Sequence, residues 1–182
     1  MQNPSHMKSL SQRIDENIAR VPDFPKPGIQ YKDITTLFQN PQLCTEIVHA
    51  FVEFSRGKVD VVCGIESRGF LFGIQVAQTL GVPFVLIRKQ GKLPPPVVAE
   101  SYALEYGEAT IEVQPQYIQP GMRVLIHDDV LATGGTAEAS AKLIEKCGGT
   151  VCQFSFIAEL EFLQGKEKLS LFTNDIQSLV RY

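Results

Sequence analysis

Apolar and polar residues recur along the first third of the chain with a helical period. Residues 8–20 and 41–55 carry apolar side chains every three or four positions, which predicts two amphipathic helices. Between them, residues 21–36 contain three prolines and a glycine. Because proline lacks an amide hydrogen and glycine favours turns, we expect an ordered, extended segment there without a regular element.

From residue 59 onward, continuous apolar runs alternate with helical patterns. Such runs are typical of strands buried on both faces, and therefore of a mostly parallel sheet flanked by helices. A chain of 182 residues fits one domain, so we predict a single α/β domain over 1–182 with residues 1–10 disordered. The predicted strands are 59–65, 84–87, 110–113, 123–127 and 150–158, and the predicted helices between them are 70–80 and 134–147.

Three of these strands are followed by polar clusters. Glu66-Ser67-Arg68 follows the first strand, Arg88-Lys89 the second, and Asp128-Asp129 the strand 123–127. In open α/β sheets, ligands bind beyond the carboxyl ends of the strands, where the strand order reverses. The pattern therefore predicts that all three clusters line one site.

The acid pair is followed by Thr133-Gly134-Gly135-Thr136 at a predicted strand-to-helix junction. Main-chain amides at such a junction bind anions, and the two glycines permit close approach. The segment lacks the Gly-Lys-Ser/Thr ending of a nucleotide-triphosphatase loop. Two carboxylates would repel a bare phosphate but accept hydroxyl donors, so a phosphorylated sugar fits both halves. A plain turn beside solvated acids is the alternative.

Composition narrows the function classes. A net charge of −3 argues against a partner that is a nucleic acid or an anionic membrane. No apolar run approaches the roughly 20 residues of a membrane-spanning helix, and the first residues do not resemble an export signal. The four cysteines lack metal-site spacing, so we expect buried, reduced thiols and a cytoplasmic protein.

The stretch 124–140 resembles the phosphoribosyl-pyrophosphate motif of the type I phosphoribosyltransferase family, and 131–136 is most similar to the members that act on adenine. Four further segments agree with that branch: 23–35, 64–73, 87–94 and 101–107. The resemblance implies the family fold, with a small hood from the N-terminal segment and a flexible flap over 88–110. It also implies transfer of the 5-phosphoribosyl group from phosphoribosyl pyrophosphate to adenine, giving AMP and pyrophosphate.

The resemblance also implies residue roles. Catalysis would involve Glu105, Asp128, Asp129 and Arg68, and the 66–69 loop would contain a cis peptide bond that does not precede proline. The sugar phosphate would bind Ala132, Thr133, Gly134, Gly135 and Thr136; pyrophosphate would bind Glu66, Ser67, Arg68, Arg88, Lys89, Lys92 and Tyr106; adenine would bind Gln30, Tyr31, Lys32 and Leu160. Mg²⁺ would be bound mainly through the substrate, with no metal ligands from the protein, and the family is typically homodimeric.

Two other functions stay open from the residues. A 6-oxopurine or orotate transferase would share the sugar-phosphate site and differ in the base. A non-catalytic regulator would keep the pocket and use its ligand as a signal, but it should carry a DNA-binding appendage and a basic face. His127 precedes the acids, and strand alternation points it away from Asp128, which predicts a core or interface histidine rather than a catalytic one.

Overall fold

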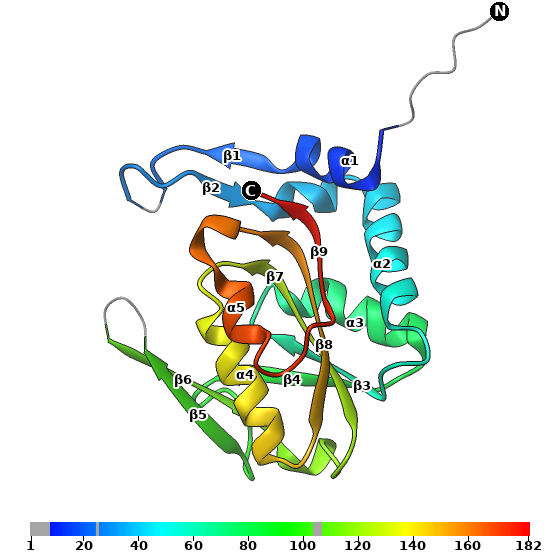
Figure 1. Ribbon diagram of the computed structural model, residues 1–182, viewed down its shortest axis with the longest axis vertical. Helices are drawn as coiled ribbons and strands as arrows, with labels where there is room; N and C mark the ends of the chain where they lie inside the picture. The colour runs from blue at the N-terminus through cyan, green and yellow to red at the C-terminus, as the bar shows by residue number, and fades with distance from the viewer. Residues whose placement is uncertain (1–7, 25, 104–106) are drawn as a thin grey trace, which may run out of the picture. The chain divides into compact units, whose positions relative to one another are not determined.

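The computed structural model describes residues 8–24, 26–103 and 107–182, and the chain forms two compact units, 1–47 and 48–182 (Figure 1). The first unit contains α1 (Leu10–Asn17), β1 (Ala19–Val21), β2 (Tyr31–Asp33), η1 (Ile34–Gln39) and the first half of α2 (Pro41–Ser55). Ser9, expected to be disordered, caps α1 by accepting from the Gln12 amide. The side chain of Gln12 accepts from the Ser9 amide in return, so the helix begins with a capping box.

The segment 21–36 contains a strand that the prolines led us to miss. β2 pairs antiparallel with β1 in the register Ala19↔Asp33, Arg20↔Lys32 and Val21↔Tyr31. Pro22 and Pro27 both lie in the connection between the two strands. Every residue of β2 therefore keeps an amide hydrogen for pairing. The prediction of no regular element was wrong for Val21, which ends β1, for residues 31–33, and for residues 34–36, which begin η1.

The second unit is built on a mostly parallel sheet, as predicted. In the described residues this sheet has seven strands in the order β5-β6-β4-β3-β7-β8-β9. All neighbours from β4 to β9 are parallel, while β6 runs antiparallel to both β4 and β5. Its elements are β3 (Val61–Ile65), α3 (Gly69–Leu80), β4 (Phe84–Lys89), β5 (Val98–Ala103), β6 (Glu108–Val113), η2 (Pro115–Tyr117), β7 (Arg123–Leu131), α4 (Gly135–Lys146), β8 (Thr150–Glu159), η3 (Glu161–Leu163), α5 (Gly165–Leu169) and β9 (Ile176–Arg181).

One face of this sheet packs against α4. Successive side chains of a strand point to opposite faces, and Val61, Cys63 and Ile65 of β3 share one buried cluster with Ala139 and Leu143 of α4. Figure 1 shows α4 and α5 in front of the sheet in this view. The continuous apolar run of β3 is explained by this covering, because all five of its residues are buried.

The other face packs against α3 and the second half of α2. Gly73 of α3 lies against the rings of Phe84 and His127, where a methyl group would come within 2.9 Å of the Phe84 ring. Phe51 of α2 contacts His127 edge-to-face, with ring centroids 5.1 Å apart. Helices on both faces confirm the predicted α/β class.

The weakly patterned stretch 88–110 contains a β-hairpin. Val98 pairs with Val113 and Ala103 with Glu108, so β5 and β6 extend the sheet at one edge (Figure 1). The side chains of β5 alternate between half-buried and exposed. With no apolar run to mark it, the strand gave a weak signal in the sequence, and the mobility expected of this segment stays a prediction.

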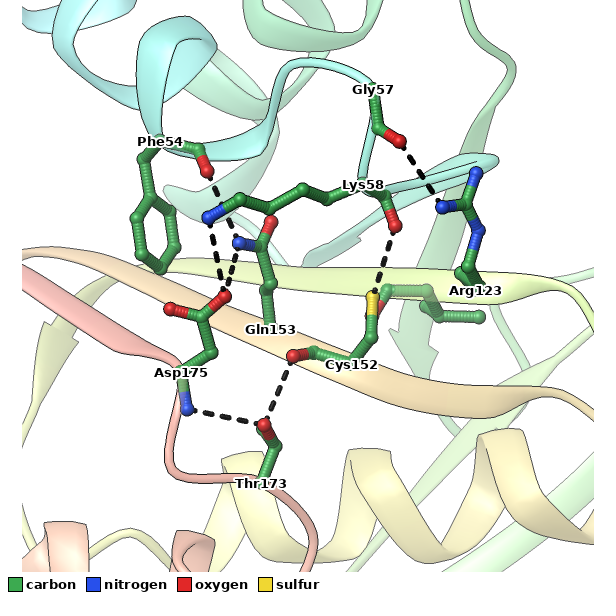
Figure 2. A network of polar contacts seen from close by, with 9 residues as sticks. Phe54, Gly57, Lys58, Arg123, Cys152, Gln153, Thr173 and Asp175 are labelled. Carbon is green, nitrogen blue, oxygen red and sulfur yellow. Dashed lines mark hydrogen bonds and ion pairs between the residues drawn. The ribbon is translucent and has the colours of Figure 1, made fainter.

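The amino ends of the strands are fixed by a polar network (Figure 2). The buried Gln153 side chain donates to the carbonyl of Phe54 at 3.2 Å and to the Asp175 carboxylate at 2.6 Å. At the start of β7, Arg123 donates to the Gly57 carbonyl and forms an ion pair with Asp60 at 2.7 Å. The strands are thus held together at the end opposite the predicted site.

Candidate active site

The carboxyl ends of β3, β4 and β7 meet at one edge of the second unit. β3 lies between β4 and β7, so the strand order reverses there, as expected for a ligand site. The Glu66 amide donates to the Ile87 carbonyl at 2.9 Å. A methyl group on Gly69 would lie 2.7 Å from the His127 carbonyl oxygen, so glycine allows the 66–69 loop to pack directly on β7.

The acid pair lies inside β7 rather than beyond its end. β7 continues to Leu131, and Asp128 pairs with Phe156 of β8 while Leu131 pairs with Glu159. The prediction that this strand ends at His127 was therefore wrong. The strand continues because Val130 and Leu131 are apolar and extend the pairing with β8 past the two acids.

Beyond β7, the chain turns into α4 through the predicted anion-binding loop. Gly134 has a φ of 77°, a left-handed conformation that favours glycine, and α4 begins at Gly135. The loop encloses a pocket of about 80 Å³. That volume exceeds the space of one water but is far below that of a drug-sized ligand, and it suits a phosphate group. Its lining is Asp128, Val130, Leu131, Ala132, Thr133, Gly134, Gly135, Thr136, Ala137 and Phe156.

The two acids have different partners. Asp128 lines the small pocket, and its Oδ1 accepts from the Asp129 amide at 2.8 Å. The Asp129 carboxylate, whose side chain is only 6% exposed, pairs with Nε of Arg68 at 2.8 Å. Burial raises the pKa of Asp128 well above its ordinary value, and the Asp129 charge adds to the shift. Asp128 therefore holds a proton more readily than an isolated carboxylate would.

The 66–69 loop has the unusual backbone that the resemblance implied. The Glu66–Ser67 peptide bond is cis, which confirms that expectation. The loop ends at Arg68, immediately before α3 begins at Gly69. Because Arg68 pairs with Asp129, the loop is joined to the acid pair as well as to the end of β4.

Glu66 holds the basic segment that follows β4. Its carboxylate accepts from the Lys89 amide at 2.9 Å and from Nε of Arg88 at 3.2 Å. Burial alone would raise the pKa of Glu66, but these contacts outweigh it and the pKa lies below its ordinary value. Arg88 is thus neutralised by a carboxylate, and the charge of Lys89 adds to the lowering of the Glu66 pKa.

The remaining predicted site residues belong to three separate parts of the chain. Glu105 and Tyr106 fall outside the described residues. Leu160 follows β8, and its amide donates to the carbonyl of Leu131 at 2.9 Å, beside the anion-binding loop. Gln30, Tyr31 and Lys32 belong to the first unit, where the Tyr31 ring meets Phe24 edge-to-face at 5.1 Å, so the predicted stacking of adenine between Tyr31 and Leu160 stays a prediction.

Comparison with known proteins agrees with this geometry. Residues 33–160 match the family model of the phosphoribosyl transferase domain. The chain is 51% identical to the adenine phosphoribosyltransferase of Cytophaga hutchinsonii over 95% of this chain and 96% of that protein. The chain belongs to the adenine phosphoribosyltransferase family. The crystal structure of the Thermoanaerobacter pseudethanolicus enzyme has a TM-score of 0.90 with 43% identity, covering 96% of this chain and 100% of that one. A Saccharomyces cerevisiae enzyme, solved with adenine and an imino-altritol bisphosphate, has a TM-score of 0.87 at 38% identity, covering 93% and 98%.

Two residues of this phosphoribosyltransferase site were missed by the sequence analysis. Gly165, the first residue of α5, packs on the backbone of the anion-binding loop, and a methyl group there would overlap the Ala132 carbonyl oxygen. Tyr102 of β5 is hydrogen bonded to Thr136. Gly165 lies 29 residues after Thr136 in a helix too short to show a period, and no local pattern links Tyr102 to the loop.

Within residues 8–24, 26–103 and 107–182, no group of three or more histidine, cysteine, aspartate or glutamate side chains could hold a metal ion. In the same ranges, no helix combines the length and the apolar character needed to span a bilayer. All four cysteines are free thiols, of which only Cys63 is fully buried.

His127 is the buried histidine expected from strand alternation. It is fully buried, its Nδ1 lies 2.8 Å from the Ser155 hydroxyl oxygen, and burial lowers its pKa from 6.5 to about 4. These contacts give it a packing role on the face of the sheet that carries α3.

We expect His127→Asn to reduce the loss of stability on acidification. The unfolded chain gains a proton on this ring below about pH 6.5, whereas the folded protein does so only near pH 4. The wild-type protein should therefore lose about 2 kcal/mol from this group between pH 7 and pH 5. Urea unfolding at both pH values measures the loss. The exposed His49→Asn serves as control, and an unchanged loss in His127→Asn would contradict the account.

Proposed function

We propose that this chain transfers the 5-phosphoribosyl group of phosphoribosyl pyrophosphate to adenine and releases AMP and pyrophosphate. The observation that carries this proposal is the small pocket that joins Asp128 to the loop 133–136. It offers main-chain donors for a phosphate beside acceptors for sugar hydroxyls. The relatives named above are adenine phosphoribosyltransferases, which supports the same reaction.

The loop fixes one end of the sugar. Amides of Ala132 to Thr136 and the N-terminus of α4 would bind the 5′-phosphate, because they present hydrogen-bond donors and a favourable helix dipole. Asp128 and Asp129 would accept from the ribose hydroxyls. Holding both ends of the ribose places its C1′ in one position, so that the base attacks from a fixed direction.

Charged side chains of the protein would lower the free-energy barrier of phosphoribosyl transfer. The base nitrogen attacks C1′ as pyrophosphate leaves from the opposite face, and the ring gains positive charge as in glycoside cleavage. The acid pair faces that charge, while Arg68, Lys89 and Lys92 face the charge that grows on pyrophosphate. Ser67, which lies in the 66–69 loop beside Arg68, would also contact pyrophosphate.

Mg²⁺ would enter bound to the diphosphate of the substrate. The two oxygen-rich side chains of Asp128 and Asp129 suit a hard cation but do not by themselves form a metal site. When bound, the ion would offset negative charge on the leaving group. The protein's own contribution is the cationic surface from Arg68 and the segment after β4.

We propose that Tyr31 and Leu160 stack on the two faces of the base, that main-chain groups of Gln30 and Lys32 contact its edge, and that Glu105 handles its proton. Tyr106 would contact pyrophosphate. Competition among adenine, hypoxanthine, guanine and orotate tests this proposal. A preference for hypoxanthine or orotate would overturn the base assignment, and an absence of AMP formation would favour the non-catalytic regulator.

Glu66 is proposed as part of the pyrophosphate site, and its contacts give it a positioning role. We expect Glu66→Gln to raise the KM for phosphoribosyl pyrophosphate about tenfold and to leave the KM for adenine unchanged. Glutamine can still accept from the Lys89 amide, but it loses the charge that orients Arg88. Steady-state kinetics with each substrate varied measures both constants.

A matched control is Glu53→Gln, which removes another glutamate paired with an arginine, Arg56 on α2. Because that pair is exposed, both KM values should stay at wild-type levels. Equal rises in both constants for Glu66→Gln would show general damage to the site and count against a positioning role.

We also propose a homodimer in a reducing, cytoplasmic environment. Leu71 and Ile74, one turn apart on α3, and Leu86 on β4 are each more than one-third exposed, and a second copy of the chain would bury them. The four free thiols support the compartment. Sedimentation of the purified chain tests the dimer.

A further inference from the structure

Tyr102 links the β5–β6 hairpin to the anion-binding loop. It lies in β5, opposite Ala109 of β6. The Thr136 hydroxyl donates to the phenol oxygen of Tyr102, with 3.0 Å between the two oxygens. Thr136 is the second residue of α4 and lines the small phosphate-sized pocket, whereas Tyr102 does not. Tyr102 is therefore hydrogen bonded to a residue of the pocket without lining that pocket itself.

The position of Tyr102 is fixed by several other contacts. Its ring packs against the main apolar cluster and lies 3.6 Å from where a methyl group on Gly135 would be. On the same strand, the Ala99 carbonyl accepts from Nζ of Lys146 at 3.3 Å, and the Glu100 carboxylate pairs with the same ammonium group. β5 is thus docked along α4, and the phenol is held at the start of that helix.

Tyr102 also lines a second, larger pocket. It has a volume of about 300 Å³ and lies between β5 and α4. Gly135 lines both pockets, Tyr102 lines only the larger one and Thr136 only the smaller one. Tyr102 is half-buried, and its hydroxyl can act as a donor or as an acceptor.

The pairing with Tyr102 determines whether the Thr136 hydroxyl can donate to an anion in the pocket. A threonine hydroxyl has one proton to donate and two lone pairs to accept with. While Thr136 donates to Tyr102, it has no proton for an anion in the pocket. If the phenol rotates its proton toward Thr136 instead, the threonine proton is released for the anion. A tyrosine can take either role, and a phenylalanine can take neither.

We propose that Tyr102 is a positioning residue that turns the Thr136 hydroxyl toward the 5′-phosphate. In the free protein the phenol accepts from Thr136, and with phosphate bound it donates to Thr136, which then donates to a phosphate oxygen. No bond other than these hydrogen bonds changes. This inference depends on the proposed function, because it assumes that a sugar phosphate occupies the loop.

A double-mutant cycle on AMP affinity tests the pairing. Tyr102→Phe should weaken AMP binding about three- to tenfold. One hydrogen bond that supports a contact to a charged ligand contributes about that much to affinity. Thr136→Val should weaken it at least as much, because it removes the hydroxyl itself. In the Thr136→Val background, Tyr102→Phe should change AMP affinity by less than about twofold. Calorimetric titration with AMP measures all four proteins, and adenosine, which lacks the phosphate, should bind each of them alike.

Two controls separate this role from a loss of structure. Tyr117→Phe removes a hydroxyl from a tyrosine that is 55% exposed on η2, and it should leave AMP affinity unchanged. Thr136→Ser keeps the hydroxyl and should retain most of the affinity that Thr136→Val loses. Thermal unfolding of each variant shows whether it is folded.

The outcomes distinguish this inference from the proposed function. If the wild-type protein forms no AMP from adenine and phosphoribosyl pyrophosphate, the proposed function is wrong. If the wild-type protein is active but Tyr102→Phe binds AMP normally, only the role of Tyr102 is overturned. If Tyr102→Phe weakened AMP binding as much in the Thr136→Val background as in the wild-type protein, that result would likewise overturn it. The two hydroxyls would then act independently.

Discussion

Asp129→Asn is expected to lower kcat about a hundred- to a thousandfold without unfolding the protein. Asparagine has the same size and can still hydrogen bond, so the packing at the end of β7 should persist. What is lost is the negative charge that pairs with Arg68 at 2.8 Å and that would face the cationic sugar ring. Because that charge acts mainly in the transition state, the change should fall on kcat more than on KM.

Steady-state turnover with both substrates saturating measures this effect. Asp60→Asn is a matched control, because Asp60 pairs with Arg123 at 2.7 Å at the opposite end of the sheet. It removes an aspartate–arginine pair of the same type, remote from the acid pair, and should leave kcat unchanged. A near-normal kcat in Asp129→Asn would exclude this carboxylate from the mechanism.

Gly165→Ala is expected to lower kcat/KM for phosphoribosyl pyrophosphate about a hundredfold, since misplacing a binding element by about 1 Å has effects of that size. The added methyl group would overlap the Ala132 carbonyl oxygen and lie 2.9 Å from the Gly134 amide nitrogen. These are backbone atoms of the anion-binding loop and cannot rotate away as a side chain could. The loop must therefore shift, and its amides would no longer converge on the phosphate.

Gly81→Ala controls for the general effect of replacing a glycine. Gly81 ends α3 with a φ of 71°, and a methyl group there would have no neighbour within 4 Å. This variant should lose stability, by about 1 kcal/mol of backbone strain, while keeping its substrate affinity. Wild-type kcat/KM in Gly165→Ala would show that the loop does not depend on the contact with α5.

The sequence predicts five of the seven described strands of the central sheet, and best those that are buried on both faces; β9, in which Gln177, Ser178 and Leu179 are only half-buried, was missed. Val61–Ile65 is entirely apolar, and its burial by helices on each side leaves little choice of structure. β5 was missed for the opposite reason, since its residues alternate between half-buried and exposed. β2 was missed because nearby prolines argued against a strand, although they occupy only the connection before it.

The site was predictable where its chemistry is local in the chain. Asp128 and the loop 133–136 are close in sequence, and the pocket that they share follows from the strand-to-helix turn. Contacts between distant segments were not predictable. Glu66 binds Arg88 from 22 residues away, and Tyr102 reaches Thr136 across 34 residues. Such pairs depend on strand order and on the docking of the hairpin, which no local pattern encodes.

A crystal structure of the chain with AMP bound tests the central claim most directly. The account predicts that the 5′-phosphate lies within hydrogen-bond distance of the main-chain amides at Thr133–Thr136, with the ribose hydroxyls on Asp128 and Asp129. An AMP molecule bound elsewhere, with that turn empty and open to solvent, would contradict it.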